Sequence, residues 1–220
     1  MSEWWTYTLQ DFLLFSSRTY YRLYEIYNAA IWPAQVAALA LALGILVLVR
    51  RGNAGRSVSA ILAALWLWVA IAFHAMHYAT IHTAGRHFAW AFGVEAALLA
   101  WMGAVRARIS FERPADLAGR VGLGIFLFAL VVEPLASPLV GRGWRAAELF
   151  GVAPDPTAVG TLGLLLLARA RRRWILMIVP ALWCAITGAF LLAMKAPDFW
   201  VPPLAALAAI ALAVSRPRAR

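Results

Sequence analysis

Residues 154–173 read PDPTAVGTLGLLLLARARRR, and this stretch decides the fold. Asp between two Pro is a good helix start, with Asp155 as the N-cap and Pro156 in the first helical position. The apolar run 157–168 ends at Arg residues that belong at a membrane surface. At about 1.5 Å per residue the helix rises only about 20 Å, against a hydrocarbon core of about 30 Å. The sequence therefore predicts a short fifth helix that begins inside the membrane, where residues 149–154 dip in to meet it.

A helix that starts inside the membrane has consequences for the chain before it. Irregular backbone at that depth must be buried in protein or line a water-filled cavity. Short, Pro-interrupted hydrophobic segments also point to binding sites in transporters. We therefore expect a polar chamber near the start of this helix.

Apolar segments and Arg residues alternate along the whole chain. The segments that we expect to cross the membrane are 31–49, 58–78, 87–105, 121–140, 157–168, 174–194 and 199–214. Arg residues crowd every second connection, at 50–56, 106–120, 169–173 and 216–220. This pattern is typical of an all-α integral membrane protein with seven transmembrane helices, its N-terminus outside and its C-terminus cytoplasmic.

Composition supports a membrane protein and argues against other classes. The chain is 64% hydrophobic and 14% charged, whereas soluble proteins are about 45–50% apolar and about 25% charged. The net charge of +10 could suggest nucleic-acid binding, but the Arg residues flank apolar segments, where topology and anionic lipid account for them. The single Cys184 excludes an intrachain disulfide and a metal site built from Cys alone.

Three regions follow from these patterns. Residues 1–30 carry charges and many aromatic side chains, which predicts an amphipathic helix in the outer interface of the bilayer. Residues 31–216 form the seven-helix transmembrane domain, and residues 217–220 a basic cytoplasmic tail. We expect the protein to be multi-pass in a bacterial inner (plasma) membrane.

Ionisable residues inside the apolar segments are few, and they share a depth. They are His74 and His77 in the second segment, Glu95 in the third, Glu133 in the fourth and Asp155 at the start of the fifth. All lie in the predicted outer half of the bundle or near it. Ionisable groups inside membranes are costly, so these residues are the candidates for a functional site.

Four explanations for this set stay open. The groups could form a structural network that fixes helix register. They could hold a divalent metal, with His74 and His77 on one helical face and Glu133 nearby, although the zinc-protease spacing is absent. Glu133, Glu95 and His74 could form a proton or cation path. The positive end of the short helix could bind an anion beside Arg86 or Arg145, but Asp155 already occupies that end.

Sequence signals of an enzyme are weak. The chain has no Gly-x-Ser-x-Gly motif and no Gly-rich phosphate-binding loop. Lys195 lies near the end of the sixth segment, which argues against a retinal Schiff base. An enzymatic activity is therefore the less favoured class.

Three stretches carry a family resemblance. They are Tyr27-Asn28-Ala29-Ala30-Ile31-Trp32-Pro33-Ala34-Gln35, the segment from Trp66-Leu67-Trp68 to Phe73-His74, and Pro156-Thr157 leading into Thr161-Leu162-Gly163-Leu164-Leu165-Leu166. They resemble a family of uncharacterised bacterial multi-pass membrane proteins, catalogued as a domain of unknown function. Members are sometimes labelled transporter permeases, so the resemblance implies a membrane transport protein.

The first functional hypothesis is a transporter or permease for a small solute, ion or metal. Its site would contain His74, Glu95, Glu133 and Asp155, with Tyr27 and Asn28 closing it from above. The alternative is a non-transporting membrane subunit or sensor, in which the same network is structural and a membrane protein partner or a second copy docks on the chain. An intramembrane metal-dependent enzyme is the third hypothesis.

Overall fold

The structure is a computed structural model that describes residues 15–52 and 54–215. The α-helices are α1 (Ser17–Ala30), α2 (Ala34–Arg51), α3 (Gly55–Trp68), α4 (Gly85–Leu99), α5 (Leu117–Leu127), α6 (Glu133–Leu139), α7 (Pro154–Leu167), α8 (Arg173–Ala193) and α9 (Val201–Ser215). Three of them, α3, α4 and α5, continue directly into π-helical turns, which are η3 (Val69–Ala75), η5 (Ala100–Val105) and η6 (Phe128–Val132). The all-α prediction is confirmed.

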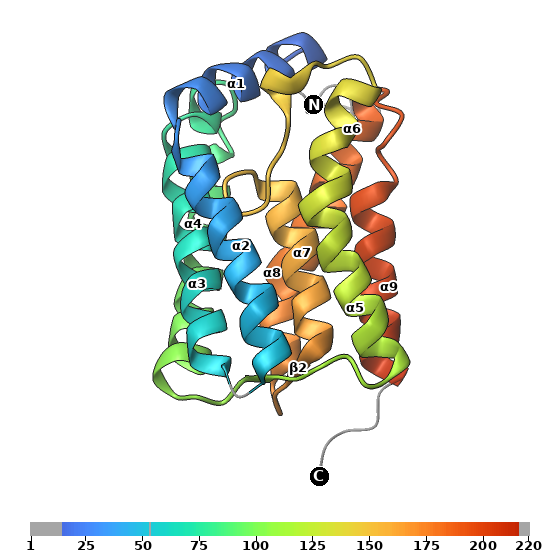
Figure 1. The fold of residues 1–220 in the computed structure, drawn as a ribbon. Helices are drawn as coiled ribbons and strands as arrows, with labels where there is room; N and C mark the ends of the chain where they lie inside the picture. Colours follow the sequence, from blue (N-terminus) through green and yellow to red (C-terminus); the bar gives the residue numbers. More distant parts are fainter. Residues whose placement is uncertain (1–14, 53, 216–220) are drawn as a thin grey trace, which may run out of the picture.

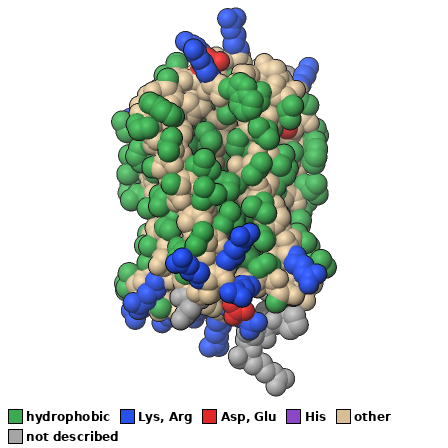
Figure 2. Space-filling model, in the orientation of Figure 1, with side chains coloured by type: hydrophobic (Ala, Val, Ile, Leu, Met, Phe, Trp, Pro, Cys, Tyr) green, Lys and Arg blue, Asp and Glu red, His purple; other side chains and the backbone are tan. Residues whose placement is uncertain are grey.

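Five helical stretches are long and apolar enough to cross a membrane. They are Ala34–Arg51, Gly55–Thr80, Gly85–Val105, Leu117–Leu139 and Arg173–Ala193. Apolar side chains cover the waist of the molecule, and Lys and Arg gather mostly at one end (Figure 2). A helix bundle with this surface is suited to a lipid environment.

Helix α1 lies across the end of the bundle opposite the arginine-rich end (Figure 1). Ser16 caps it, because the Ser16 hydroxyl accepts a hydrogen bond from the Thr19 amide at 3.2 Å. Its buried face is mostly aromatic, with Tyr20, Leu23, Tyr24 and Tyr27. This agrees with the amphipathic helix predicted for residues 1–30, of which 1–14 lie outside the described part. The predicted tail 217–220 also lies outside it.

Helix α7 occupies the centre of the bundle, where α5, α8 and α9 pack around it. It has 14 residues and every one of them is buried. Such a helix rises about 21 Å, so the prediction of a short, Pro-initiated helix is confirmed. The predicted cap is wrong, because α7 begins at Pro154 and Ala153 stands in the N-cap position. Asp155 lies inside the first turn, and its carboxylate bonds to α8 instead of capping its own helix.

The chain before α7 descends into the bundle, as the sequence predicts (Figure 1). We call residues 145–153 the descending chain. The turn is stabilised by Thr157, whose hydroxyl accepts from the Gly151 amide at 2.8 Å and donates to the Ala153 carbonyl at 2.6 Å. Gly151 has a φ of +86°, which Gly adopts readily and other residues rarely do. Internal hydrogen bonds thus replace the water that this backbone would otherwise need.

At the arginine-rich end, a short two-stranded sheet secures the far end of α7. Strand β2 (Ala168–Arg169) follows α7 directly and pairs antiparallel with β1 (Ser110–Phe111). Next to this pair, the Glu112 amide donates to the Leu167 carbonyl at 3.1 Å. The sheet therefore satisfies backbone groups that the helix end leaves free.

Helices α5 and α7 pack tightly through glycine residues, and this packing predicts the effect of adding a single methyl group. A Cβ on Gly122 would lie 2.5 Å from the Gly163 carbonyl oxygen, whereas a Cβ on Gly124 would meet nothing within 4 Å. We expect Gly122→Ala to lower the free energy of unfolding by about 1–3 kcal/mol through overpacking. Gly124→Ala, the matched control in the same helix, should be neutral or slightly stabilising. Unfolding of the purified variants in detergent measures both; equal stabilities would contradict this packing.

Candidate functional site

A cavity that is partly open to the surface lies at the start of α7. Its volume is about 60 Å³, enough for a few water molecules, since one needs roughly 10–15 Å³ of such space. Its polar wall consists of Glu133, Arg142, Glu148, Asp155, Asp198 and Ser137, and its apolar wall of Phe128, Ala136, Leu191, Val201 and Pro202. We call it the carboxylate cavity.

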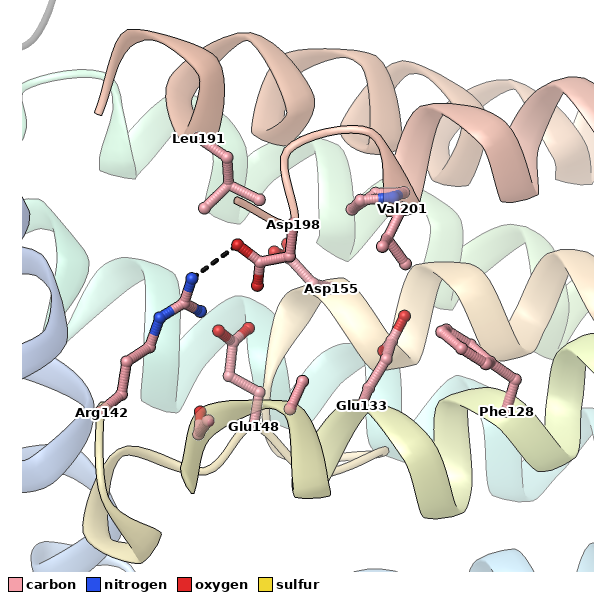
Figure 3. Close-up of a pocket in the computed structure, with 11 residues that line it drawn as sticks. Phe128, Glu133, Arg142, Glu148, Asp155, Leu191, Asp198 and Val201 are labelled. Carbon is pink, nitrogen blue, oxygen red and sulfur yellow. Dashed lines mark hydrogen bonds and ion pairs between the residues drawn. The ribbon is translucent and has the colours of Figure 1, made fainter. Parts of the chain in front are cut away.

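Each carboxyl group reaches the carboxylate cavity from a different element (Figure 3). Glu133 opens α6 immediately after the π-helical turns of η6. Glu148 lies on the descending chain, Asp155 in the first turn of α7, and Asp198 between α8 and α9. The cavity therefore exists because α7 is short, since a full-length α7 would fill this space.

Asp155 has the best-satisfied carboxylate of the cavity. Its Oδ1 accepts from Trp183 Nε1 at 2.6 Å, and its Oδ2 accepts from the Thr187 hydroxyl at 2.9 Å. Both donors come from α8. These hydrogen bonds and the positive end of the α7 dipole stabilise the ionised form, whereas burial opposes it.

Arg142 holds the outer wall of the cavity together. Its guanidinium pairs with the Asp198 carboxylate at 2.6 Å, and only 8% of the Arg142 side chain and 22% of the Asp198 side chain are exposed. The same guanidinium lies 4.2 Å from the centre of the Tyr21 ring on α1. This side chain thus joins α1 to the α8–α9 connection through one ion pair and one cation–π contact.

Glu133 and Glu148 lack comparable partners. Neither carboxyl oxygen of Glu133, nor Oε2 of Glu148, is hydrogen-bonded or exposed among the described residues. Glu148 is 9% exposed. The Tyr24 hydroxyl and the Arg142 guanidinium both act on the Glu148 carboxyl. Four carboxyl groups thus face one guanidinium in the cavity.

The structure separates the predicted site residues into two groups. Glu133 and Asp155 line the carboxylate cavity, whereas His74 and Glu95 are fully buried elsewhere. The His74 ring packs against Phe92 at 4.4 Å and Trp183 at 4.8 Å between ring centres. Since Trp183 also bonds to Asp155, this indole links His74 to the cavity without placing it there.

Tyr27 and Asn28 do not line the cavity, although the sequence suggested that they close it. The Tyr27 hydroxyl donates to the Val152 carbonyl at 2.8 Å. The Asn28 amide donates to the carbonyls of Arg145 and Ala147, both at 2.9 Å. They therefore fix α1 onto the backbone of the descending chain.

The predicted divalent metal site is not formed. Within residues 15–52 and 54–215, no group of three or more His, Cys, Asp or Glu side chains could hold a metal ion. His77 Nδ1 lies 2.6 Å from the Ala72 carbonyl, and its ring contacts Tyr27. His74 instead faces Phe92 and Trp183, so the two imidazoles have different neighbours, and Glu133 lines the cavity beside α7.

An anion site is also disfavoured. Arg86 and Arg145, the partners expected for an anion, do not line the carboxylate cavity. The cavity instead carries several carboxyl groups, which repel anions and attract cations.

Three residues of the cavity were missed by the sequence analysis. Glu148 directly precedes the segment predicted to dip into the membrane, so its burial could have been inferred. Arg142 and Asp198 lie in separate connections, 56 residues apart. No spacing rule joins them, because the two connections meet only in the folded bundle.

These features define a class. An all-helical fold with five stretches able to cross a membrane, built around a buried half-length helix and an acidic cavity, is that of a membrane protein. The chain belongs to a family of unknown function, DUF6064, whose family model matches residues 17–220. This confirms the expected uncharacterised family. Among curated proteins and among solved structures, nothing matches the chain.

The hydrogen bonds to Asp155 give a test of how strongly the cavity is tied to α8. Thr187→Val keeps the shape of the side chain but removes the donor to Oδ2. We expect a loss of about 1.5–3 kcal/mol in unfolding free energy, because the acceptor is a buried charged group. Thr80→Val is the control, since the exposed Thr80 hydroxyl donates to the neutral His77 carbonyl. Chemical unfolding in detergent should show a clearly smaller loss for the control; equal losses would count against an ionised Asp155.

Proposed function

We propose that this protein transports a small cation, with the proton included, and that the ion binds in the carboxylate cavity. One observation carries the proposal: four carboxyl groups and a single guanidinium line a partly open cavity where a helix begins inside the bundle. Half-length helices that start at membrane depth form the binding sites of many transporters.

Size limits the substrate. Sites for organic ligands occupy about 300–1,000 Å³, whereas the carboxylate cavity measures about 60 Å³. A small ion with its water molecules fits this volume, and an organic solute does not. The structure therefore favours the ion among the substrates expected from the sequence.

The proposed topology has seven crossings. The five long stretches make five of them, α9 makes another, and α7 together with the descending chain completes the last. The arginine-rich end faces the cytoplasm and α1 lies on the outer surface, as the positive-inside bias requires. In this orientation the cavity lies in the outer half of a bacterial inner membrane.

A second candidate is a non-transporting subunit or sensor. The bonds of Asp155 to α8, and of Tyr27 and Asn28 to the descending chain, support it, because they tie elements together as a structural network does. A membrane protein partner or a second copy would then act on the bundle. The Glu133 carboxyl, which has no hydrogen-bond partner among the described residues, favours the transporter, since a purely structural network has no need of it.

The topology predicts which loops an impermeant thiol reagent reaches. In a Cys184→Ala background, single cysteines replace exposed residues at the two ends. Cysteines at positions 86 and 195 should react on intact cells, and those at 56 and 172 only after permeabilisation. Labelling of all four from one side, or of positions 172 and 195 from the same side, would refute seven crossings with this orientation.

The transport proposal predicts the behaviour of Glu133→Gln. The variant keeps the side-chain shape but removes the negative charge that a cation needs. We expect ion flux into proteoliposomes, measured for H⁺, Na⁺ and K⁺ in turn, to fall by roughly tenfold or more, because a buried charged partner contributes at least about 1.4 kcal/mol.

Glu25→Gln is the matched control, because Glu25 lies on α1 in an ion pair with Arg22, outside the cavity. Its flux should equal that of the wild type. If Glu133→Gln leaves flux unchanged and only alters the unfolding temperature, the structural network is the better description.

A further inference from the structure

The charges around the carboxylate cavity do not balance. Its ionisable wall consists of Glu133 from α6, Arg142 and Glu148 from the α6–α7 connection, Asp155 from α7 and Asp198 from the α8–α9 connection. From neighbouring elements, Tyr21 and Tyr24 of α1 and Cys184 of α8 also act on this set. Arg142 is the cation among these groups, and it can neutralise one carboxylate.

Two of the four acids have neighbouring groups that stabilise their ionised forms. Asp198 has the guanidinium of Arg142. Asp155 has the Trp183 and Thr187 donors and the helix end. Glu133 and Glu148 have no cation of their own, so ionising both would place two more like charges in a buried space, at high cost.

A bound metal cation does not resolve the imbalance well. Hard cations such as Mg²⁺ and Ca²⁺ take about six or more oxygen ligands at close range. Among the described residues, the acidic side chains do not come together as a metal-binding group. A proton needs only one carboxyl oxygen, so it suits the two oxygens of Glu133 and Oε2 of Glu148, which have no hydrogen-bond partner among the described residues.

We propose that the carboxylate cavity is a proton-binding site in which Glu133 and Glu148 carry exchangeable protons, and that Arg142 moves from Asp198 to Glu148 when Glu148 releases its proton. The role of this proton in transport rests on the proposed function, whereas its binding does not.

The geometry lets Arg142 change directly from Asp198 to Glu148. The Glu148 carboxyl points toward the Arg142 guanidinium in the cavity (Figure 3). On release, the proton passes from the Glu148 hydroxyl to water in the cavity, and the new carboxylate accepts hydrogen bonds from Arg142. Asp198, which is partly exposed, is then hydrated from outside. Reprotonation of Glu148 returns Arg142 to Asp198.

The exchange also reaches α1. Because the guanidinium stacks on Tyr21 while it pairs with Asp198, its movement loosens the contact between α1 and the α8–α9 connection. Proton release thereby favours opening of the cavity at the α1 end.

The test is an infrared titration of the full chain in lipid nanodiscs from about pH 5 to about pH 9, a window above the usual carboxyl range. We expect the C=O band of protonated carboxyl groups to decline as the pH rises. Glu133→Gln and Glu148→Gln should each remove part of this band. Glu112→Gln should leave it unchanged, because Glu112 is exposed and paired with Arg169. Glu95→Gln assigns the band of the buried carboxyl outside the cavity.

Asp198→Asn tests the partner exchange. Without the Asp198 carboxylate, Arg142 should pair with Glu148 and lower the pKa of that carboxyl. The titration midpoint of the Glu148 band should therefore fall by about 1 pH unit or more. The double variant Asp198→Asn/Arg142→Gln should reverse this movement. An unmoved midpoint in Asp198→Asn would overturn the exchange.

Flux in the same preparations separates the two proposals. Absence of any band removed by Glu133→Gln or Glu148→Gln overturns the proton site, even if Na⁺ or K⁺ crosses the vesicles. If the variants remove carboxyl bands but the vesicles show no ion flux, the proton site is upheld and the transport proposal is overturned. If the variants remove carboxyl bands and Glu133→Gln also abolishes an H⁺ flux, both proposals are supported.

Discussion

A short helix that begins inside the bundle is the constraint on which the rest of this structure depends. α7 has 14 residues, all buried, so the chain must enter the bundle without helical hydrogen bonds before α7 begins. Buried backbone groups need partners. Thr157, Tyr27 and Asn28 supply them from α7 and α1. The path of the descending chain, the position of α1 and the space beside α7 are thus consequences of the length of α7.

The same constraint explains why acidic groups gather there. The positive end of α7 lies inside the protein, where it stabilises Asp155, and α8 adds two donors. The space left beside this first turn is then open to Glu133 and Glu148. Arg142 closes it from outside through its ion pair with Asp198, and it leaves both oxygens of Glu133 and Oε2 of Glu148 without a hydrogen-bond partner among the described residues. A cavity rich in acids is therefore a product of the backbone path as much as of the side chains themselves.

The sequence predicts how far along the bundle an element lies better than which neighbours its side chains face. The length of the apolar run and the Arg cluster were sufficient to predict the short helix, the descending chain and a polar region near its start. They did not show that His74 and Glu95 face other neighbours than Glu133 and Asp155. One physical reason is the π-helical turns at Val69–Ala75, which change the rotation per residue and upset the assumed three-residue spacing of His74 and His77. The pairing of Arg142 with Asp198 depends on packing between distant segments, which no local pattern encodes.

The anchoring of α1 also bears on how the protein is made. Tyr27 and Asn28 bond to carbonyls 117 to 125 residues further along the chain. During synthesis these acceptors emerge from the ribosome long after α1, so α1 cannot make these hydrogen bonds until the later segments are in place. Its docking is therefore a late step of folding, completed only once the chain as far as Val152 has taken its place in the bundle.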